Sequence, residues 1–493
     1  MSLAGLAACL ASPGAFAQPD RGATTPGLDQ TVSPASATPA PISDIIPVAR
    51  PRLLVLTDIS NEPDDEESLV RLLVYSNQFE IEGLVATTSA WLQDRTREDL
   101  IRRMVYAYGE VRTNLLKHAD GFPSVEHLLA VTATGQAGFG MAAVGDGMTT
   151  AGSHRITEAV DREDERPLWI TIWGGSNTLA QALRDVRASR SAAELARFVS
   201  KIRVYSISDQ DNAGPWMRRE FPGLVYIVSP SNPSSWEDYY LATWTGISGD
   251  RNYRNGPGHR FEMVDNPWLT DNVIRGHGPL GALYPPLKYI MEGDTPSYLG
   301  LIDNGLGSSI SPDYGGWGGR YKLYQPAGET RPTWTHNSSA RDTVTADNGR
   351  TETSSQATIW RWREHYQNDF AARMDWCVAD RYDDANHNPR PVLNGDTTSA
   401  VLEFSAESGA TVDLSAIGTT AGDDGQTVGV SWWIYNEAGS IWGAKLTRDD
   451  GLSTRVVLPR LDRPGTLHVI LQATDNGTPP LVAYRRAIIR ATP

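Results

Sequence analysis

Cysteine is almost absent from this chain of 493 residues, which contains only Cys9 and Cys377. Cys9 lies in an apolar N-terminal run that has the composition of a leader. Removal of that leader would leave a single thiol, which excludes an intrachain disulfide. A protein of this length can rely on its hydrophobic core for stability instead.

The chain also has no excess of positive charge, and it has no long apolar stretches. It has 44 Lys and Arg against 59 Asp and Glu, for a formal net charge of -15. Nucleic-acid partners require a basic face, so this balance argues against them. After the leader, no stretch approaches the roughly 18 to 20 apolar residues of a membrane helix. We therefore expect no membrane span.

Aromatic residues and glycine, by contrast, are plentiful: there are 15 Trp, 18 Tyr and 45 Gly. Together with a hydrophobic content of 40%, they indicate a globular chain with sizeable cores. The length indicates two to four domains. Aromatic faces also stack on the apolar faces of sugar rings, so the composition favours a carbohydrate ligand.

The first 49 residues have the composition of a targeting and linker region. Residues 1–17 form a small-residue apolar run that ends in the A-x-A pattern of Ala15, Phe16 and Ala17, which predicts a signal peptide. An alternative is a lipoprotein cleavage box that ends at Cys9. Residues 18–49 are rich in Pro, Thr, Ala and Ser, which predicts a disordered linker. Both alternatives predict export, to the periplasm or the exterior.

Residues 50–388 alternate short apolar runs with amphipathic stretches. Strands are expected at residues 52–56, 81–89, 167–173, 201–208 and 224–229, and helices from Pro63, at 95–116 and at 178–186. This alternation predicts an α/β domain with a mostly parallel sheet flanked by helices. The segment 230–388 is expected to be mostly irregular and to shape a site.

Residues 389–493 contain short β-type runs separated by Gly, Asp, Asn and Pro. Their spacing predicts an immunoglobulin-like β-sandwich. Trp432 and Trp433 are adjacent in one of these runs, so one should face the core and the other should face outward, toward a glycan or the other domain.

The stretch Val55 to Val70 holds six acidic residues in sixteen. Asp58 comes directly after the first strand, and Asp64 to Glu67 fall in the first turn of the following helix. Other polar residues follow later strands: Trp173 to Asn177 follow the third and Asp209 to Asn212 the fourth. Strand ends of a parallel sheet meet at one edge, where ligands bind. Carboxylates gathered there would suit Ca²⁺ or Mg²⁺.

Simpler interpretations exist for each group. Asp64 to Glu67 are also the ordinary acidic start of a helix, and we expect Glu66 and Glu67 to have only that role. Asp209 and Asp211 could be turn or N-cap residues. His277, alone in "RGHGPLG", could be a hydrogen-bonded structural group.

Several longer motifs carry a resemblance to a known family. "LLVLTDISNEPDDEESLVRLL" and "WGGSNTLAQAL" resemble segments of nucleoside hydrolases. "HGPLGALYPP", "EGDTPSYLGLIDNGLG" and "PDYGGWGGRY" extend the resemblance to the nucleoside-hydrolase-like, cellulose-binding family of bacterial exported proteins, over residues 52–493. The resemblance implies a nucleoside-hydrolase-like fold, a C-terminal β-sandwich and a polysaccharide or oligosaccharide ligand.

The resemblance also implies roles for individual residues. Asp58 would activate water and bind Ca²⁺ together with Asp65, the carbonyl of Trp173 and Asp294, while Asp64 would face sugar hydroxyls. Two departures stand out in this sequence. The gap between Asp58 and Asp64 is two residues longer than in nucleoside hydrolases, and Gly293 stands where many of them carry a catalytic His.

These observations predict a glycoside hydrolase. Asp58 is the candidate base, and Glu292 or His277 is the candidate group that assists the leaving group. The candidate substrate-binding residues are Asn61, Asp64, Asn177, Asp209, Asp211, Trp317 and Arg320. The alternatives are a non-catalytic polysaccharide-binding protein and a nucleoside N-ribohydrolase.

Overall fold

The structure is a computed structural model that describes residues 50–493, except 61, 230–245, 249–258, 336–339 and 347. The expected signal peptide with Cys9, the expected linker and the candidate residue Asn61 lie outside the described residues. Within the described part, every helix is too short or too polar to cross a membrane.

An eight-stranded sheet forms the centre of the α/β domain, in the order β3-β2-β1-β4-β5-β6-β8-β7. All neighbouring pairs from β3 to β8 are parallel, and only β7 runs antiparallel, against β8. The strands are β1 (Arg52–Thr57), β2 (Glu80–Ala86), β3 (Thr132–Thr134), β4 (Leu168–Ile172), β5 (Ile202–Ser206), β6 (Val225–Ile227), β7 (Lys322–Tyr324) and β8 (Thr333–Thr335). The parallel α/β sheet expected from the apolar runs is confirmed.

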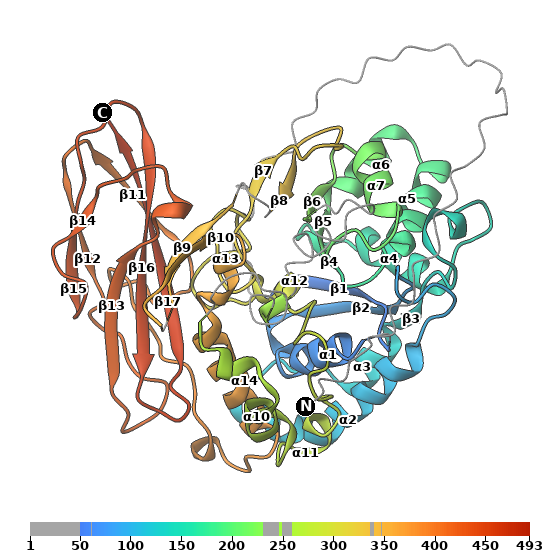
Figure 1. The fold of residues 1–493 in the computed structure, drawn as a ribbon, viewed down its shortest axis with the longest axis horizontal. Helices are drawn as coiled ribbons and strands as arrows, with labels where there is room; N and C mark the ends of the chain where they lie inside the picture. The colour runs from blue at the N-terminus through green and yellow to red at the C-terminus, as the bar shows by residue number, and fades with distance from the viewer. Residues whose placement is uncertain (1–49, 61, 230–245, 249–258, 336–339, 347) are drawn as a thin grey trace, which may run out of the picture. The chain divides into compact units, whose positions relative to one another are not determined.

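Helices cover both faces of this sheet (Figure 1). Leu53 and Val55 share a core with α1 (Asp64–Val74), α2 (Glu98–His118) and α14 (Arg363–Trp376). Leu54 and Leu56, which point to the other face, pack with α4 (Ala151–Asp161), α5 (Asn177–Ser189) and α7 (Ala213–Glu220). Shorter helices are α3 (Val125–Ala130), α6 (Ala192–Ser200), α10 (Asn266–Leu269), α11 (Gly278–Gly281), α12 (Pro296–Leu299) and α13 (Ala357–Trp360). Burial on both faces explains why the strands are continuously apolar.

The segment expected to be mostly irregular contains more regular structure than its sequence indicates. It holds β7, β8, the hairpin of β9 (Asp342–Thr345) and β10 (Thr351–Ser354), and the 14-residue helix α14. No apolar stripe marks α14, because Arg363, Asp369 and Arg373 are buried in it beside Phe370. Asp369 and Arg373 pair with each other, at 3.1 Å, which permits their burial.

The C-terminal strands form two sheets with a shared core, as expected for a β-sandwich. One sheet has the order β11-β17-β16-β13 and the other β12-β15-β14. The bounds are β11 (Leu402–Glu407), β12 (Thr411–Ser415), β13 (Val428–Ile434), β14 (Lys445–Leu446), β15 (Ser453–Val457), β16 (Gly465–Asp475) and β17 (Val482–Thr492). Trp432 lies in the core between them, whereas Trp433 packs against Trp362 of the α/β domain, with ring centroids 5.6 Å apart.

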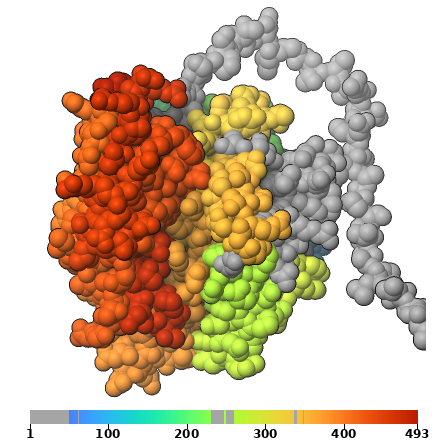
Figure 2. Space-filling model, turned by 60° about the vertical axis from the view of Figure 1, so that its left-hand side comes forward, coloured from blue at the N-terminus to red at the C-terminus, as the bar shows by residue number. Residues whose placement is uncertain are grey.

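The β-sandwich packs directly against residues of the α/β domain (Figure 2). The Tyr484 backbone N–H donates to the carbonyl of Asn304, at 3.0 Å. Gly305 lies so close to this strand that an added Cβ would be 1.7 Å from the Tyr484 carbonyl oxygen, and its φ of +88° also favours glycine. Arg486 of β17 donates to the carbonyls of Leu306 and Gly315. We call this contact region the junction.

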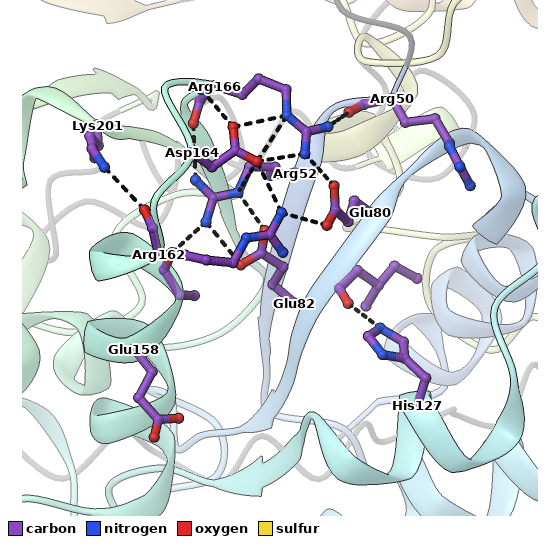
Figure 3. A network of polar contacts seen from close by, with 12 residues as sticks. Arg50, Arg52, Glu80, Glu82, His127, Glu158, Arg162, Asp164, Arg166 and Lys201 are labelled. Carbon is purple, nitrogen blue, oxygen red and sulfur yellow. Dashed lines mark hydrogen bonds and ion pairs between the residues drawn. The ribbon is translucent and has the colours of Figure 1, made fainter.

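An ion-pair network joins the opposite, N-terminal ends of β1 and β2 (Figure 3). Arg52 is fully buried and donates two hydrogen bonds to the carboxylate of Glu82. Arg162 and Arg166 bind Glu80 and share Asp164 with each other. This network holds the sheet at the end opposite the carboxyl ends of the strands.

Candidate functional site

Acidic side chains gather at the carboxyl end of β1. Asp58 follows the strand directly, α1 supplies Asp64 and Asp65 in its first turn, and Asp294 comes from the segment that leads into α12. Carboxylate oxygens of Asp64, Asp65 and Asp294 all lie within 4.8 Å of one another. The structure therefore brings together the four aspartates expected at this strand end.

The turn between β1 and α1 is held by local contacts. Thr57 Oγ1 accepts from the backbone N–H of Ile59, at 3.1 Å, and donates to Asp65. Ser60 has a φ of +99°, a left-handed conformation that is uncommon outside glycine. Asp65 is thus fixed from β1 across a strained turn, which is typical of functional sites.

Burial and mutual repulsion shift the titration of the aspartates. Burial raises the pKa of Asp58 to about 7, against the effect of a hydrogen bond from Ser89. Burial and the neighbouring carboxylates raise the pKa values of Asp65 and Asp294 well above their usual range. Oδ2 of Asp294 is buried and has no hydrogen-bond partner. A divalent cation would neutralise this charge, and hard oxygen ligands of this kind are those that Ca²⁺ takes.

Two glycines are required by the packing around the aspartates. An added Cβ at Gly293 would be 2.2 Å from Oδ2 of Asp64, and one at Gly174 would be 2.4 Å from Oδ1 of Asp58. The carboxylate of Asp64 thus occupies the space that a side chain at position 293 would need. This gives a physical reason for the absence of a His before Asp294.

Trp173 follows β4 directly and lies at its carboxyl end. Its carbonyl oxygen, which the resemblance assigns as a metal ligand, accepts a hydrogen bond from Nε2 of Gln210, at 2.5 Å. Its indole Nε1 donates to Oγ of Ser297, at 3.0 Å, in α12. Trp173 therefore joins β4 to the segment that carries Asp294.

Asn177 and Asp211 are close to each other and tie two helix starts together. Asp211 accepts from the backbone N–H of Asn177, at 3.0 Å, from Oγ of Ser176, at 2.8 Å, and from the backbone N–H of Ala213, at 2.9 Å. Asn177 donates to the carbonyl of Gly138, at 2.8 Å, while its buried Oδ1 has no partner. These contacts match the capping alternative for Asp211.

Asp209 is occupied by an ion pair. Both its oxygens accept from Arg218, each at 2.8 Å, and Arg218 also binds Glu329, at 2.6 Å. Arg218 is buried at 1% exposure, so the pair anchors α7 beneath the strand ends.

The two candidates for assisting the leaving group are also engaged. Glu292 is fully buried, pairs with Arg71 at 2.6 Å, and accepts from the hydroxyls of Tyr284 and Thr295. His277 lies 3.1 Å from a carboxylate oxygen of Asp375 in α14. Their catalytic role remains a prediction.

Trp317 and Arg320 lie at the junction. Nε1 of Trp317 donates to the Tyr484 hydroxyl, at 3.3 Å. Arg320 is buried against Asp342, at 2.7 Å. These contacts tie Trp317 to the β-sandwich and Arg320 to the start of β9.

Glu67 differs from the sequence-based expectation. It is fully buried, and its Oε2 accepts from the backbone N–H of Glu292, at 2.8 Å. It is therefore not an ordinary solvated first-turn residue. The spacing of Asp64, Glu67 and Arg71 places all three on one face of α1, and this signal was present in the sequence.

Ser89 was not singled out by sequence reasoning either. It follows β2 and hydrogen-bonds to Asp58, while its Oγ also accepts from the backbone N–H groups of Trp91 and Leu92. Its place as the last residue of the expected strand 81–89 was the available signal.

This chain is similar to known proteins in both sequence and structure. Residues 52–321 match the family described as cellulose-binding Sde182, nucleoside hydrolase-like domain, and residues 411–491 match the C-terminal domain of cellulose-binding protein Sde0182. A solved nucleoside hydrolase-related protein from Saccharophagus degradans, described as associated with carbohydrate metabolism, is 37% identical. The alignment covers 90% of this chain and 100% of that one, with a TM-score of 0.76.

Other comparisons add no argument. The effector protein XOO4466 is 11% identical over 59% of this chain and 89% of its own, but the TM-score is 0.29. Human CDH23 EC21-23 matches 21% of this chain and 35% of its own at 15% identity, with a TM-score of 0.16. No curated protein gives a match.

Proposed function

This chain belongs to the cellulose-binding, nucleoside hydrolase-like Sde182 family, and on that basis we propose that it is an exported glycoside hydrolase of poly- or oligosaccharides. The observation that supports this proposal most directly is the cluster of Asp58, Asp64, Asp65 and Asp294. Four carboxylates at one strand end are costly to bury unless they hold a cation or share protons.

Asp58 is the proposed general base. Without a bound cation, burial raises the pKa of Asp58 to about 7, and a cation beside it would lower that pKa and keep the carboxylate ionised, as a base must be to accept a proton. Ser89 orients its carboxylate, and Asp64 would hydrogen-bond a sugar hydroxyl. Asp58 would take a proton from the water that attacks the anomeric carbon while the glycosidic C–O bond breaks through an oxocarbenium-like transition state, and Glu292 or His277 would give a proton to the leaving oxygen.

The residues that would hold a divalent cation are Asp65, Asp294, Asp58 and the carbonyl of Trp173. The unpartnered, buried Oδ2 of Asp294 supports this donor set, since it lacks any other compensating contact. A bound Ca²⁺ would supply positive charge that makes water easier to deprotonate.

The engagement of Glu292 and His277 supports a second candidate function. If neither group protonates the leaving oxygen, the same site would bind a polysaccharide without cutting it. A cluster of four carboxylates is, however, more than binding requires, and this favours the hydrolase.

The test is an assay for new reducing ends on cello-oligosaccharides and soluble glucans. We expect turnover by the parent protein, a loss of at least about 100-fold in Asp58→Asn, and a similar loss with chelator that added Ca²⁺ reverses. Asp413→Asn, at an exposed position of β12, is the matched control. Tight glycan binding by the parent protein with no turnover would favour the binding function instead.

A further inference from the structure

A cavity lies at the junction. It has a volume of about 450 Å³, within the range of about 300–1,000 Å³ that small-molecule sites occupy. Its walls come from the segment after α12, from α14, from the connection before the β-sandwich and from β17. None of Asp58, Asp64, Asp65 and Asp294 lines it.

The walls of this cavity are held by contacts that do not depend on a ligand. Asn388 donates to Asp369 of α14, at 2.7 Å. Arg485 donates to Oδ1 of Asp396, at 2.8 Å, and to the carbonyl of Ala400, at 3.0 Å. The backbone bond from Tyr484 to Asn304 and the close approach at Gly305 fix the remaining wall. The cavity is therefore preformed, which lowers the cost of binding.

The lining combines apolar surface with neutral polar groups. Ile302, Val392 and Val482 are buried lining residues and supply apolar surface, together with the indole of Trp317. Gln78, Thr397, Thr398 and Thr420 also line the cavity and supply one amide and three hydroxyls. An apolar wall with such donors and acceptors matches a pyranose ring, which has apolar faces and a hydroxylated edge.

The charges of the lining are balanced. Arg373 pairs with Asp369 at 3.1 Å, and Arg485 pairs with Asp396 at 2.8 Å. One further residue of each sign, Asp303 and Arg390, is exposed at the lining. The lining itself holds three Arg and two Asp, and the additional Arg485 is neutralised by Asp396 just outside it, so the cavity suits a neutral ligand better than an anion or a cation.

We propose that the junction cavity is a second carbohydrate site, which binds a segment of a neutral glucan chain. This goes beyond the proposed hydrolase function, because the site would hold the chain at a place where no bond is cut. The segment that lines the cavity at Ile302 to Gly305 follows α12 directly, and α12 follows Asp294. Both sites would thus be carried by one short segment of the chain.

The test is calorimetric titration with cellopentaose, in the Asp58→Asn background so that turnover cannot consume the ligand. Thr420→Trp fills the cavity from an exposed position, and the double variant Gln78→Ala/Asp303→Ala removes polar groups with little change in packing. We expect each to lose one bound cellopentaose per chain or at least tenfold in affinity. Thr411→Trp, at an exposed position of β12 outside the cavity, should bind as the background does.

Melting temperatures of all variants identify any that fail to fold. If Thr420→Trp fails to fold, the double variant Gln78→Ala/Asp303→Ala decides the outcome. Unchanged stoichiometry and affinity in the folded cavity variants would overturn the proposal. So would the absence of any cellopentaose binding, or tighter binding of a charged oligogalacturonate than of cellopentaose. A hydrolase without this site would still turn over glucans, so the two proposals fail separately.

Discussion

At the scale of single residues, the site depends on how closely carboxylates and glycines approach each other. Asp64 lies against the Cα of Gly293, and Asp58 lies against that of Gly174. Such contacts allow the aspartates to converge. They also mean that a substitution of one of these glycines that adds a single methyl group would displace a carboxylate, because a packed interior has little room to adjust.

The first prediction concerns Gly293→Ala. Its Cβ would be 2.2 Å from Asp64 Oδ2, so we expect the carboxylate to move and stabilisation by Ca²⁺ to weaken. The measurement is the rise in melting temperature on adding Ca²⁺ to chelator-treated protein. Gly223→Ala is the control, because an added Cβ there meets only Val199 at 3.9 Å. An equal rise in both variants would contradict the prediction.

At this scale the sequence indicated where candidate residues lie in the fold better than it indicated which side chains they pair with. Asp58, Asp64 and Asp65 could be placed because a strand end and a helix start are visible in apolar patterns. The ion pairs of Asp209 with Arg218, Glu292 with Arg71 and Arg320 with Asp342 could not be predicted. These partners lie 9 to 221 residues apart in sequence, so only the folded chain brings them together.

At the scale of helices and strands, the sheet is anchored at both ends by different means. The carboxyl ends of the strands carry the site, while the other ends are joined by the network of Arg52, Glu82 and Arg162 (Figure 3). A rigid sheet between them supports precise placement of Asp58, since site residues on strand ends inherit the rigidity of the strands.

The second prediction tests this network with Arg52→Met. Removal of the buried guanidinium leaves the carboxylate of Glu82 with only Arg162 as a partner, at 3.2 Å. We expect a loss of about 3 kcal/mol in the free energy of unfolding. Arg490→Met breaks an exposed pair with Glu403 and should cost less than about 1 kcal/mol. Urea denaturation measures both; comparable losses would be inconsistent with a structural role for the network.

Two of the elements that sequence reasoning missed, α14 and β3, were missed for different physical reasons. The strands of the sheet were visible because both faces are buried, which makes them continuously apolar. Helix α14 was invisible because its buried faces include paired Arg, Asp and Gln residues, so no apolar stripe marks its period. The short strand β3 has three residues, too few for any pattern.

At the scale of the whole molecule, buried histidines make the fold sensitive to acid. Burial lowers the pKa values of His118 and His387, whose rings hydrogen-bond each other across 3.1 Å, and it lowers that of His468 to about 2. The charged groups that face this pair include Asp423, Lys117, Asp384 and Arg373. His468 accepts from Arg486 at the junction, at 2.8 Å.

The third prediction is that the stability contributed by these histidines is lost as the pH falls below about 6.5, whatever the raised carboxylate pKa values at the site contribute in the opposite direction. A histidine whose pKa is lower in the folded than in the unfolded chain binds protons first in the unfolded chain. Its contribution to stability is therefore complete above the pKa of the unfolded chain and decreases below that pKa. In His468→Asn the amide oxygen can still accept from Arg486 but does not titrate, and we expect a smaller loss between pH 7 and 5. Urea midpoints at both pH values measure this.

His154→Asn is the control for that experiment, because this ring is exposed. It should reproduce the acid sensitivity of the parent protein. If His468→Asn lost as much stability as the parent between pH 7 and 5, the buried ring would not be a source of the acid sensitivity.

The contact between Gly305 and Tyr484 has a consequence for how the protein is made. The carbonyl that Gly305 packs against belongs to β17, which the ribosome adds about 170 residues after Trp317. At bacterial elongation rates this interval is on the order of 10 s. During it the indole of Trp317 lacks its partner Tyr484, and the residues that pack against β17 stay uncovered. That delay would keep the chain incompletely folded, and so open to a chaperone, until its synthesis is nearly over.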